Sequence, residues 1–129
     1  TTVHDFVGKY QPNYPLLDVE NPLTFGPLDL YDYYFEHKRQ QVEDINNSKP
    51  VILEIAKEFR EISGREYGLF ETYQLEDAET AIVVLSSAAG TTKAVVDQLR
   101  QEGKKVGLLK PRVFRPFPYL EIAQALSHL

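Results

Sequence analysis

The residues with the clearest chemical character lie between Val106 and Pro118, where an apolar run ends in two arginines set among phenylalanines and prolines. Three prolines within eight residues fix their own φ angles and favour extended geometry at the residues before them. Arg112 and Arg115 are therefore expected on a stiff segment. Two guanidinium groups held in this way predict a contact element, either an interface or an anion site.

A second segment, residues 86 to 92, follows an apolar run and opens a helical pattern. Free backbone N–H groups at a helix start, helped by hydroxyl groups, can bind an anion or a phosphate. The glycines of GxGxxG and the lysine of a P-loop are missing, however, and a tight turn requires small residues in any case. Two interpretations stay open, a structural turn or an anion contact. The candidate anion ligands are Ser86, Ser87, Gly90, Thr91 and Thr92, to which Lys93 and Lys110 would add charge.

Catalytic groupings are missing from the sequence. Glu76, Asp77 and Glu79 form a carboxylate cluster without a nearby histidine, which predicts a solvated turn. Glu36 and His37 are adjacent on one predicted helix and so point in different directions. The chain has no cysteine, and its three histidines are far apart, so we expect no metal site, no thiolate nucleophile and no iron–sulfur ligand here. We predict that this chain alone is non-catalytic.

Charge is unevenly distributed along the 129 residues. The net charge is −5, which argues against nucleic acid as a partner. Residues 18–79 contain 15 acidic and 6 basic side chains, a balance of −9, whereas residues 93–115 contain 7 basic and 2 acidic ones, a balance of +5. No apolar run approaches the roughly 20 residues of a membrane span, so we expect no membrane association. The start at Thr1 suggests a soluble piece of a longer chain.

The first half of the chain is predicted to contain an arm followed by two helices. Residues 1–30 have four prolines and no regular apolar period, which indicates an extended arm or linker that lies along its own domain or a neighbour. Apolar residues at helical spacing predict a helix over 31–45 and a second over 52–62. Pro50 would begin the second helix and Gly64 would follow its end. Tyr31, Tyr34 and Phe35 are expected in the core.

Strand patterns dominate from Gly68 onward. We predict strands over 68–74, 80–86 and 106–110, with a helix over 91–102 that ends at Gly103 and a final helix that starts at Pro118. The apolar run over 81–85 is typical of a strand buried on both faces of a parallel sheet, with helices on both sides. Residues 31–129 are thus predicted to form one α/β domain, a three-layer α/β/α Rossmann-like fold. The final helix should return to a further parallel strand that the chain does not contain, which suggests a truncated sheet.

Several of these segments together resemble the alpha chain of pyruvate:ferredoxin oxidoreductase. They are the runs Gly64–Tyr73, Glu76–Glu79, Val83–Ser87 and Leu99–Leu109, followed by Arg-Val-Phe-Arg-Pro-Phe-Pro at 112–118. The resembled region is the second core domain of that family, which is similar to the carboxyl-terminal domain of transketolase. The resemblance extends to the aromatic segment at 33–37 and the arm at 10–18.

The resemblance implies a supporting role in a larger enzyme. In that family thiamine diphosphate, with Mg, binds between other domains, pyruvate is decarboxylated, electrons pass through iron–sulfur clusters to ferredoxin, and coenzyme A takes the acetyl group. None of the thiamine-binding residues falls on this chain, and a cytoplasmic location is implied. Arg112, Phe114, Arg115 and Phe117 match the second-domain motif and are expected to be interface residues. Leu85-Ser86-Ser87 departs from the Gly-Ser pair that family members often show.

The sequence is compatible with three hypotheses about the function of the chain. The first is an assembly domain of a 2-oxoacid:ferredoxin oxidoreductase, most simply the pyruvate enzyme, that positions the thiamine site and contacts coenzyme A through residues 93–115. The second is an independent Rossmann-like module that binds a phosphorylated ligand at Ser86–Thr92. The third is an interaction domain of another transketolase-like enzyme.

Overall fold

The computed structural model describes residues 2–26 and 28–129, with Thr2 described by its backbone alone. Thr1 and Pro27, both in the predicted arm, lie outside the described residues. The chain divides into two compact units, residues Thr1–Asp44 and Ile45–Leu129. The predicted boundary between arm and domain, at residue 30, stays a prediction.

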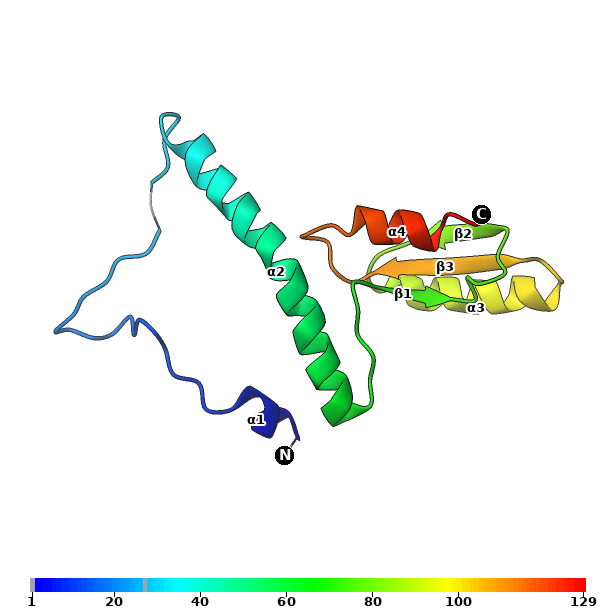
Figure 1. The fold of residues 1–129 in the computed structure, drawn as a ribbon, viewed down its shortest axis with the longest axis horizontal. Helices are drawn as coiled ribbons and strands as arrows, with labels where there is room; N and C mark the ends of the chain where they lie inside the picture. The colour runs from blue at the N-terminus through cyan, green and yellow to red at the C-terminus, as the bar shows by residue number, and fades with distance from the viewer. Residues whose placement is uncertain (1, 27) are drawn as a thin grey trace. The chain divides into compact units, whose positions relative to one another are not determined.

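The first unit contains a short helix, α1 (Thr2–Val7), and an irregular segment up to the start of α2 (Figure 1). The described residues between the two helices form neither helix nor strand, in keeping with the extended arm that the prolines predict. The helix α1 was not predicted. A local turn is closed by Asp18, whose carboxylate accepts hydrogen bonds from the backbone N–H groups of Glu20 (3.1 Å) and Asn21 (3.3 Å).

The prediction of two leading helices is wrong, because one continuous helix, α2 (Tyr34–Ser63), runs through Pro50. A proline inside a helix removes one N–H donor, but strong helix formers such as Leu53, Ala56 and Lys57 follow it and propagate the helix. Ser48, between the two predicted helices, lies within α2 and donates its hydroxyl to the Ile45 carbonyl at 2.6 Å. The predicted end is confirmed, since Gly64 has φ +69° and its N–H donates to the Arg60 carbonyl at 2.8 Å.

The aromatic cluster near the start of α2 was expected in the core, and this prediction is also wrong. Tyr31 is 96% exposed, and Tyr34 and Phe35 are exposed as well. No residue of α2 is buried. Helical spacing identifies an apolar stripe, but it does not say whether a partner surface covers that stripe.

A three-stranded sheet lies in the second unit (Figure 1). Its strands are β1 (Phe70–Tyr73), β2 (Thr80–Val83) and β3 (Val106–Pro111), in the order β1-β3-β2. β2 pairs with β3 in parallel, with Ile82 opposite Leu108, whereas β1 pairs with β3 in antiparallel fashion, with Glu71 opposite Lys110. The sheet is therefore mixed, and β3 is its centre.

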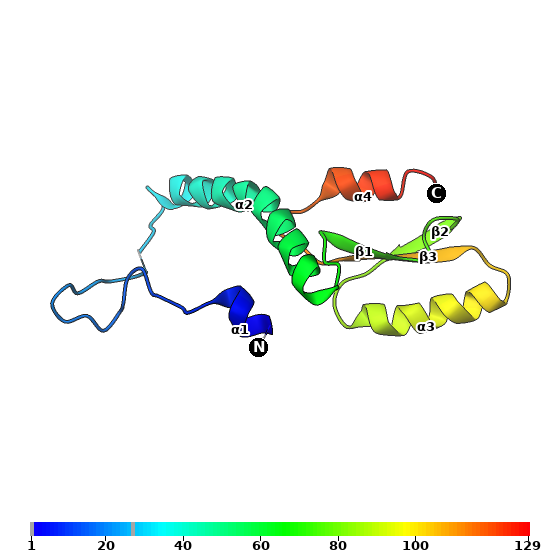
Figure 2. The same cartoon turned by 60° about the horizontal axis from the view of Figure 1, so that its bottom comes forward.

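Two helices cover opposite faces of this sheet (Figure 2). α3 (Ala88–Gln101) lies on one face and α4 (Tyr119–Ala125) on the other. Because side chains alternate along a strand, neighbouring leucines of β3 face different helices. Leu108 packs with Ala89 and Val96 of α3, whereas Leu109 packs with Ile122 of α4. The three-layer α/β/α prediction is confirmed.

The apolar run over 81–85 was expected to be buried on both faces of the sheet, but the buried strand is β3. Ile82 and Val83 of β2 are each 49% exposed, and Leu85 just after it is also exposed, so that prediction is wrong. The reason is the place of β2 at the sheet edge, where β3 is its one neighbouring strand among the described residues. The apolar run in β3 takes the central position instead, with Leu108 and Leu109 fully buried.

Two glycines set the packing around β3. Gly103 has φ +79° and ends α3, donating its N–H to the Arg100 carbonyl at 3.0 Å, as predicted. Gly107 lies within β3, where a Cβ atom would stand 2.7 Å from the carbonyl oxygen of Gln74 and 3.0 Å from the Cα of Leu75. The strand can therefore pass this close to the segment after β1 only without a side chain.

Candidate functional site

The two segments singled out in the sequence start from the same edge of the sheet. β2 and β3 are parallel, so their carboxyl ends lie at the same edge. Residues 84–87 leave that edge towards α3, and residues 112–118 leave it towards α4 on the other face (Figure 2). Adjacent strands whose connections diverge to opposite faces form the usual ligand crevice of α/β sheets. β1 begins at this edge because it runs antiparallel.

Arg112 is held by two groups of its own domain. Its guanidinium donates to Glu71 Oε2 at 2.6 Å and lies 4.6 Å from the centre of the Tyr67 ring. An arginine placed between a carboxylate and an aromatic face gains from both contacts. Its side chain retains 29% exposure. The sequence prediction that Arg112 lies on a stiff segment fits this arrangement, and its role at an interface stays a prediction.

Glu71 is the centre of this cluster and was missed in the sequence. Its other oxygen, Oε1, is paired with the ammonium group of Lys93, which also lies 5.1 Å from the centre of the Tyr73 ring. The hydrogen bond from Lys93, followed by the charges of Lys93 and Arg112, lowers the pKa of Glu71 although partial burial opposes this. The carboxylate thus stays ionised and joins β1, α3 and the segment after β3. The sequence offers no local signal for Glu71, because its partners Lys93 and Arg112 are 22 and 41 residues away.

The phenylalanines of the motif differ in their surroundings. Phe117 packs against the core cluster of Leu109 and Ile122. Phe114 meets the Phe117 ring edge to face, with 6.1 Å between centroids and 81° between planes, but is itself 63% exposed. Arg115 is exposed and makes no hydrogen bond or ion pair with any residue that the structure describes.

The turn before α3 has several of its donors already engaged. Ser86 adopts φ +59°, and its carbonyl accepts the N–H of Ala89 at 3.3 Å. The N–H of Gly90 donates to the Ser87 carbonyl at 3.1 Å, and the Thr92 hydroxyl donates to the Ala88 carbonyl at 2.9 Å. Anion binding by Ser86, Ser87, Gly90, Thr91 and Thr92 therefore stays a prediction, and Lys93, which was expected to assist it, is paired with Glu71.

A separate polar network at the opposite end of the sheet is structural. Arg100 donates to the carbonyls of Val106 (2.8 Å) and Gln74 (2.6 Å) and pairs with Asp77 at 2.8 Å. The hydrogen bond to Arg100 lowers the pKa of Asp77. Glu79 pairs with Lys105 at 3.0 Å. The carboxylate turn is thus a partly solvated turn, as predicted, and part of the basic charge after residue 93 neutralises it.

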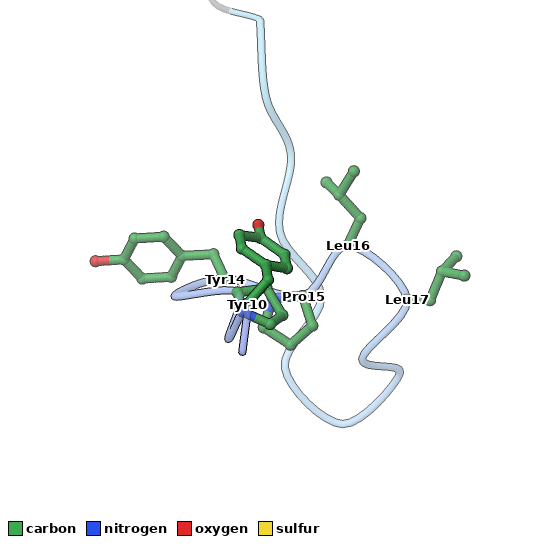
Figure 3. A pocket seen from close by; sticks show the side chains of 6 residues that line it. Tyr10, Tyr14, Pro15, Leu16 and Leu17 are labelled. Carbon is green, nitrogen blue, oxygen red and sulfur yellow. The ribbon is translucent and has the colours of Figure 1, made fainter. Parts of the chain in front are cut away.

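The arm contains a shallow apolar hollow of about 410 Å³ (Figure 3). Its lining comes from one proline-rich stretch, and the side chains of Leu16 and Leu17 point to the opposite side from Tyr14. A second hollow of about 300 Å³ lies beside His37, whose Nδ1 contacts the carboxylate of Asp29. The side chains that line the second hollow include no Ser, Thr, Cys or Lys beside the Asp29–His37 pair.

The described part of the chain has neither a metal-binding cluster nor a membrane-spanning helix. Among residues 2–26 and 28–129, no three His, Cys, Asp or Glu side chains come together as metal ligands do. No helix within those ranges combines the length and the apolarity needed to cross a bilayer. Since the sequence has no cysteine, none of its side chains can be a thiolate ligand of an iron–sulfur cluster.

Comparison with known proteins supports the resemblance. Pyruvate synthase subunit PorA of Thermotoga maritima is 58% identical over 125 residues, and the PorA subunit of Methanocaldococcus jannaschii is 42% identical over 127 residues; each alignment covers 97% of this chain. Ketoisovalerate oxidoreductase subunit VorA of Pyrococcus horikoshii is 41% identical over 129 residues, again with 97% of the chain covered. The chain spans about a third of the length of these relatives, 32% to 33%.

The family model described as pyruvate:ferredoxin oxidoreductase core domain II matches residues 78–129. That range contains β2, α3, β3 and α4, and so both connections at the carboxyl edge of the sheet. Together with the relatives aligned over nearly the whole chain, this match confirms the resemblance found in the sequence. Residues 78–129 thus match the pyruvate:ferredoxin oxidoreductase core domain II family, and nearly the whole chain is similar to part of the pyruvate synthase subunit PorA.

Proposed function

We propose that this chain is a supporting domain of a 2-oxoacid:ferredoxin oxidoreductase and that its role is to hold the catalytic domains of the enzyme in position. The main support is 58% identity to a pyruvate synthase subunit over 97% of the chain. The side chains at the carboxyl edge favour a supporting role over catalysis. There Glu71 is paired with both Lys93 and Arg112, which leaves one net positive charge and engages all three side chains within the domain.

The reaction of the whole enzyme belongs to the proposal. It is the oxidative decarboxylation of pyruvate, in which the acetyl group passes to coenzyme A and the electrons pass through iron–sulfur clusters to ferredoxin. Thiamine diphosphate with Mg would be bound by other parts of the enzyme, in the cytoplasm. Pyruvate is the favoured substrate because several relatives are named pyruvate synthase, whereas one is named ketoisovalerate oxidoreductase.

Within that enzyme, the segment 112–118 would be the contact with neighbouring domains or subunits. Its arginines and phenylalanines are residue types that dominate the binding energy of protein interfaces. Phe114 packs edge to face against Phe117, which packs on the core, so the segment enters an interface with little loss of side-chain freedom.

The test is 2-oxoacid-dependent dye reduction by the assembled enzyme with the complete subunit. Pyruvate and 2-ketoisovalerate are offered separately, each with coenzyme A. We expect pyruvate-dependent activity that falls at least about tenfold in the double variant Arg112→Ala, Arg115→Ala, together with weaker assembly. Arg65→Ala, an exposed arginine in the loop after α2, is the matched control and should leave activity unchanged. An enzyme without activity on any 2-oxoacid would refute the proposal.

Contact between coenzyme A and residues 93–115 is a further part of the proposal, supported by Lys110 and Arg115, the two basic residues of this segment that form no ion pair with the described residues. Lys110→Ala should then raise the KM for coenzyme A with little change in kcat, because a remote phosphate contact contributes equally to the ground state and the transition state. An unchanged KM would remove coenzyme A from this domain. The same experiment with Gly90→Asp, which places a negative charge at the start of α3, tests whether the Ser86–Thr92 turn faces the phosphates.

A further inference from the structure

We infer that the motif at 112–118 is divided into two pairs with different tasks. Phe114 and Arg115 dock onto the remainder of the same subunit, at a surface that presents a carboxylate beside an apolar recess. Arg112 and Phe117 do not make that contact but hold the docking pair in position, and Glu71 holds Arg112. This inference rests on the proposed function, in which the segment is an interface.

The guanidinium group of Arg112 already has both an ion-pair partner and an aromatic partner inside the domain. Its guanidinium is bound by the Glu71 carboxylate at 2.6 Å and covered on one side by the Tyr67 ring. To reach a partner, it would have to leave both groups. Its backbone is fixed as well, since the N–H groups of Arg112 and Val113 both donate to the Leu69 carbonyl, at 2.9 and 3.0 Å.

The second half of the segment, from Pro116 to Pro118, is fixed by packing against the core of the domain. Pro116 and Pro118 are buried, and Phe117 packs against the core between them. Phe117 also contacts the Tyr119 ring, with 5.7 Å between centroids. The segment is thus anchored at Arg112 and again from Pro116 onward. The residues between the anchors are presented on a rigid support, which lowers the entropy lost on binding.

Phe114 and Arg115 are the residues that this support presents. Phe114 is mostly exposed although it is a large apolar ring, and Arg115 is an exposed cation for which the described residues provide no anion. Tyr119 and Leu120 add exposed apolar surface next to them in the chain. An arginine next to an aromatic ring is the composition of an interface hot spot, and its complement is a carboxylate with an apolar pocket.

The remainder of the subunit is the occupant that the relatives favour. The chain corresponds to about a third of their length, so in these relatives about two thirds of the polypeptide lies outside the aligned region. A segment joined covalently meets this surface at an effective concentration in the millimolar range, which favours it over a separate protein. We therefore expect Phe114 and Arg115 to be covered before any other subunit binds.

Hydrogen exchange of the complete subunit, alone and in the assembled enzyme, tests this directly. The backbone N–H groups of Phe114, Arg115 and Phe117 make no backbone hydrogen bond within the described residues, so their protection reports coverage. We expect these amides to be protected in the subunit alone. Arg115→Glu should speed their exchange at least about tenfold, and Arg65→Glu, with the same change of charge in the same unit, should not. Glu71→Gln should give an intermediate increase, because Arg112 loses its anchor.

Each other outcome overturns a defined part of the inference. Protection that appears only after the other subunits bind would place the partner in another subunit. No protection in either state, or equal effects of Arg115→Glu and Arg65→Glu, would show that Phe114 and Arg115 do not dock. Exchange is measured without any substrate, so an enzyme that is inactive on 2-oxoacids would refute the proposed function and still leave the docking result readable.

Discussion

Replacement of Gly107 by alanine should destabilise the sheet more than any other single methyl group added to a glycine of the second unit. The new Cβ would stand 2.7 Å from the Gln74 carbonyl oxygen, 3.0 Å from the Leu75 Cα and 3.1 Å from the Ala78 Cβ. Ordinary contacts begin near 3.4 Å, so two backbone atoms would have to move by several tenths of an ångström. Overpacking of a rigid interior costs about 1–3 kcal/mol, and movement of backbone atoms places Gly107→Ala towards the upper end.

Gly90→Ala is the matched control for this change. Gly90 lies in α3, and a Cβ there would meet nothing within 4 Å. Alanine is favoured over glycine in a helix by about 0.8–1 kcal/mol, so the same chemical change should stabilise the chain. The two variants therefore separate the effect of space from the effect of glycine entropy.

Urea unfolding followed by circular dichroism measures both variants. With a slope of about 1–3 kcal/mol per molar urea, a loss of about 2–3 kcal/mol should lower the midpoint of Gly107→Ala by roughly 1–2 M, and Gly90→Ala should raise it by a few tenths of a molar. If Gly107→Ala unfolds at the same midpoint as the wild type, the close approach of β3 to the segment after β1 is wrong.

Three further outcomes follow from the same packing and charges. Leu109→Ala, at a fully buried position, should cost about 2–5 kcal/mol of unfolding free energy, whereas Leu120→Ala, at a residue 78% exposed, should change it by less than about 0.5 kcal/mol; equal losses would contradict the assigned core. Because the folded state lowers the pKa of Glu71 below its usual value near 4.5, its ion pairs stabilise the chain by roughly 1 kcal/mol above that pH, and the gain is lost as the pH falls through the lowered pKa. The difference in unfolding free energy between the wild type and Glu71→Gln should therefore shrink below about pH 4.5, and a constant difference would exclude these pairs. Pro50→Ala should raise helicity and stability by up to about 3 kcal/mol, measured by circular dichroism, and a loss of helicity would show that α2 needs its proline.

Local signals in the sequence predicted the elements of the second unit well. Glycine at 64 and 103 ends a helix in each case, and the apolar runs at 80–86 and 106–110 contain the two parallel strands. These signals act over a few residues and are little affected by the rest of the fold. The three-layer arrangement followed from the alternation of strand and helix patterns.

Predictions that depended on distant contacts were less successful. The run at 81–85 is as apolar as the strand β3, and only its place at the edge of the sheet leaves it half-exposed. Pro50 is a normal helix breaker, yet the residues on both sides propagate α2 through it. Glu71 could not be selected from the sequence, because Lys93 and Arg112 are brought to it by two different connections.

The unpaired edge of β2 has a consequence for handling this protein. Within the described residues, one side of β2 has no neighbouring strand, and its apolar side chains are half-exposed on both faces. Such an edge can accept a strand from any chain that is extended, apolar and free, including a second molecule of the same kind. We therefore expect the chain to aggregate increasingly as its concentration rises. A charged residue at position 83, as in Val83→Lys, should reduce this aggregation without loss of secondary structure.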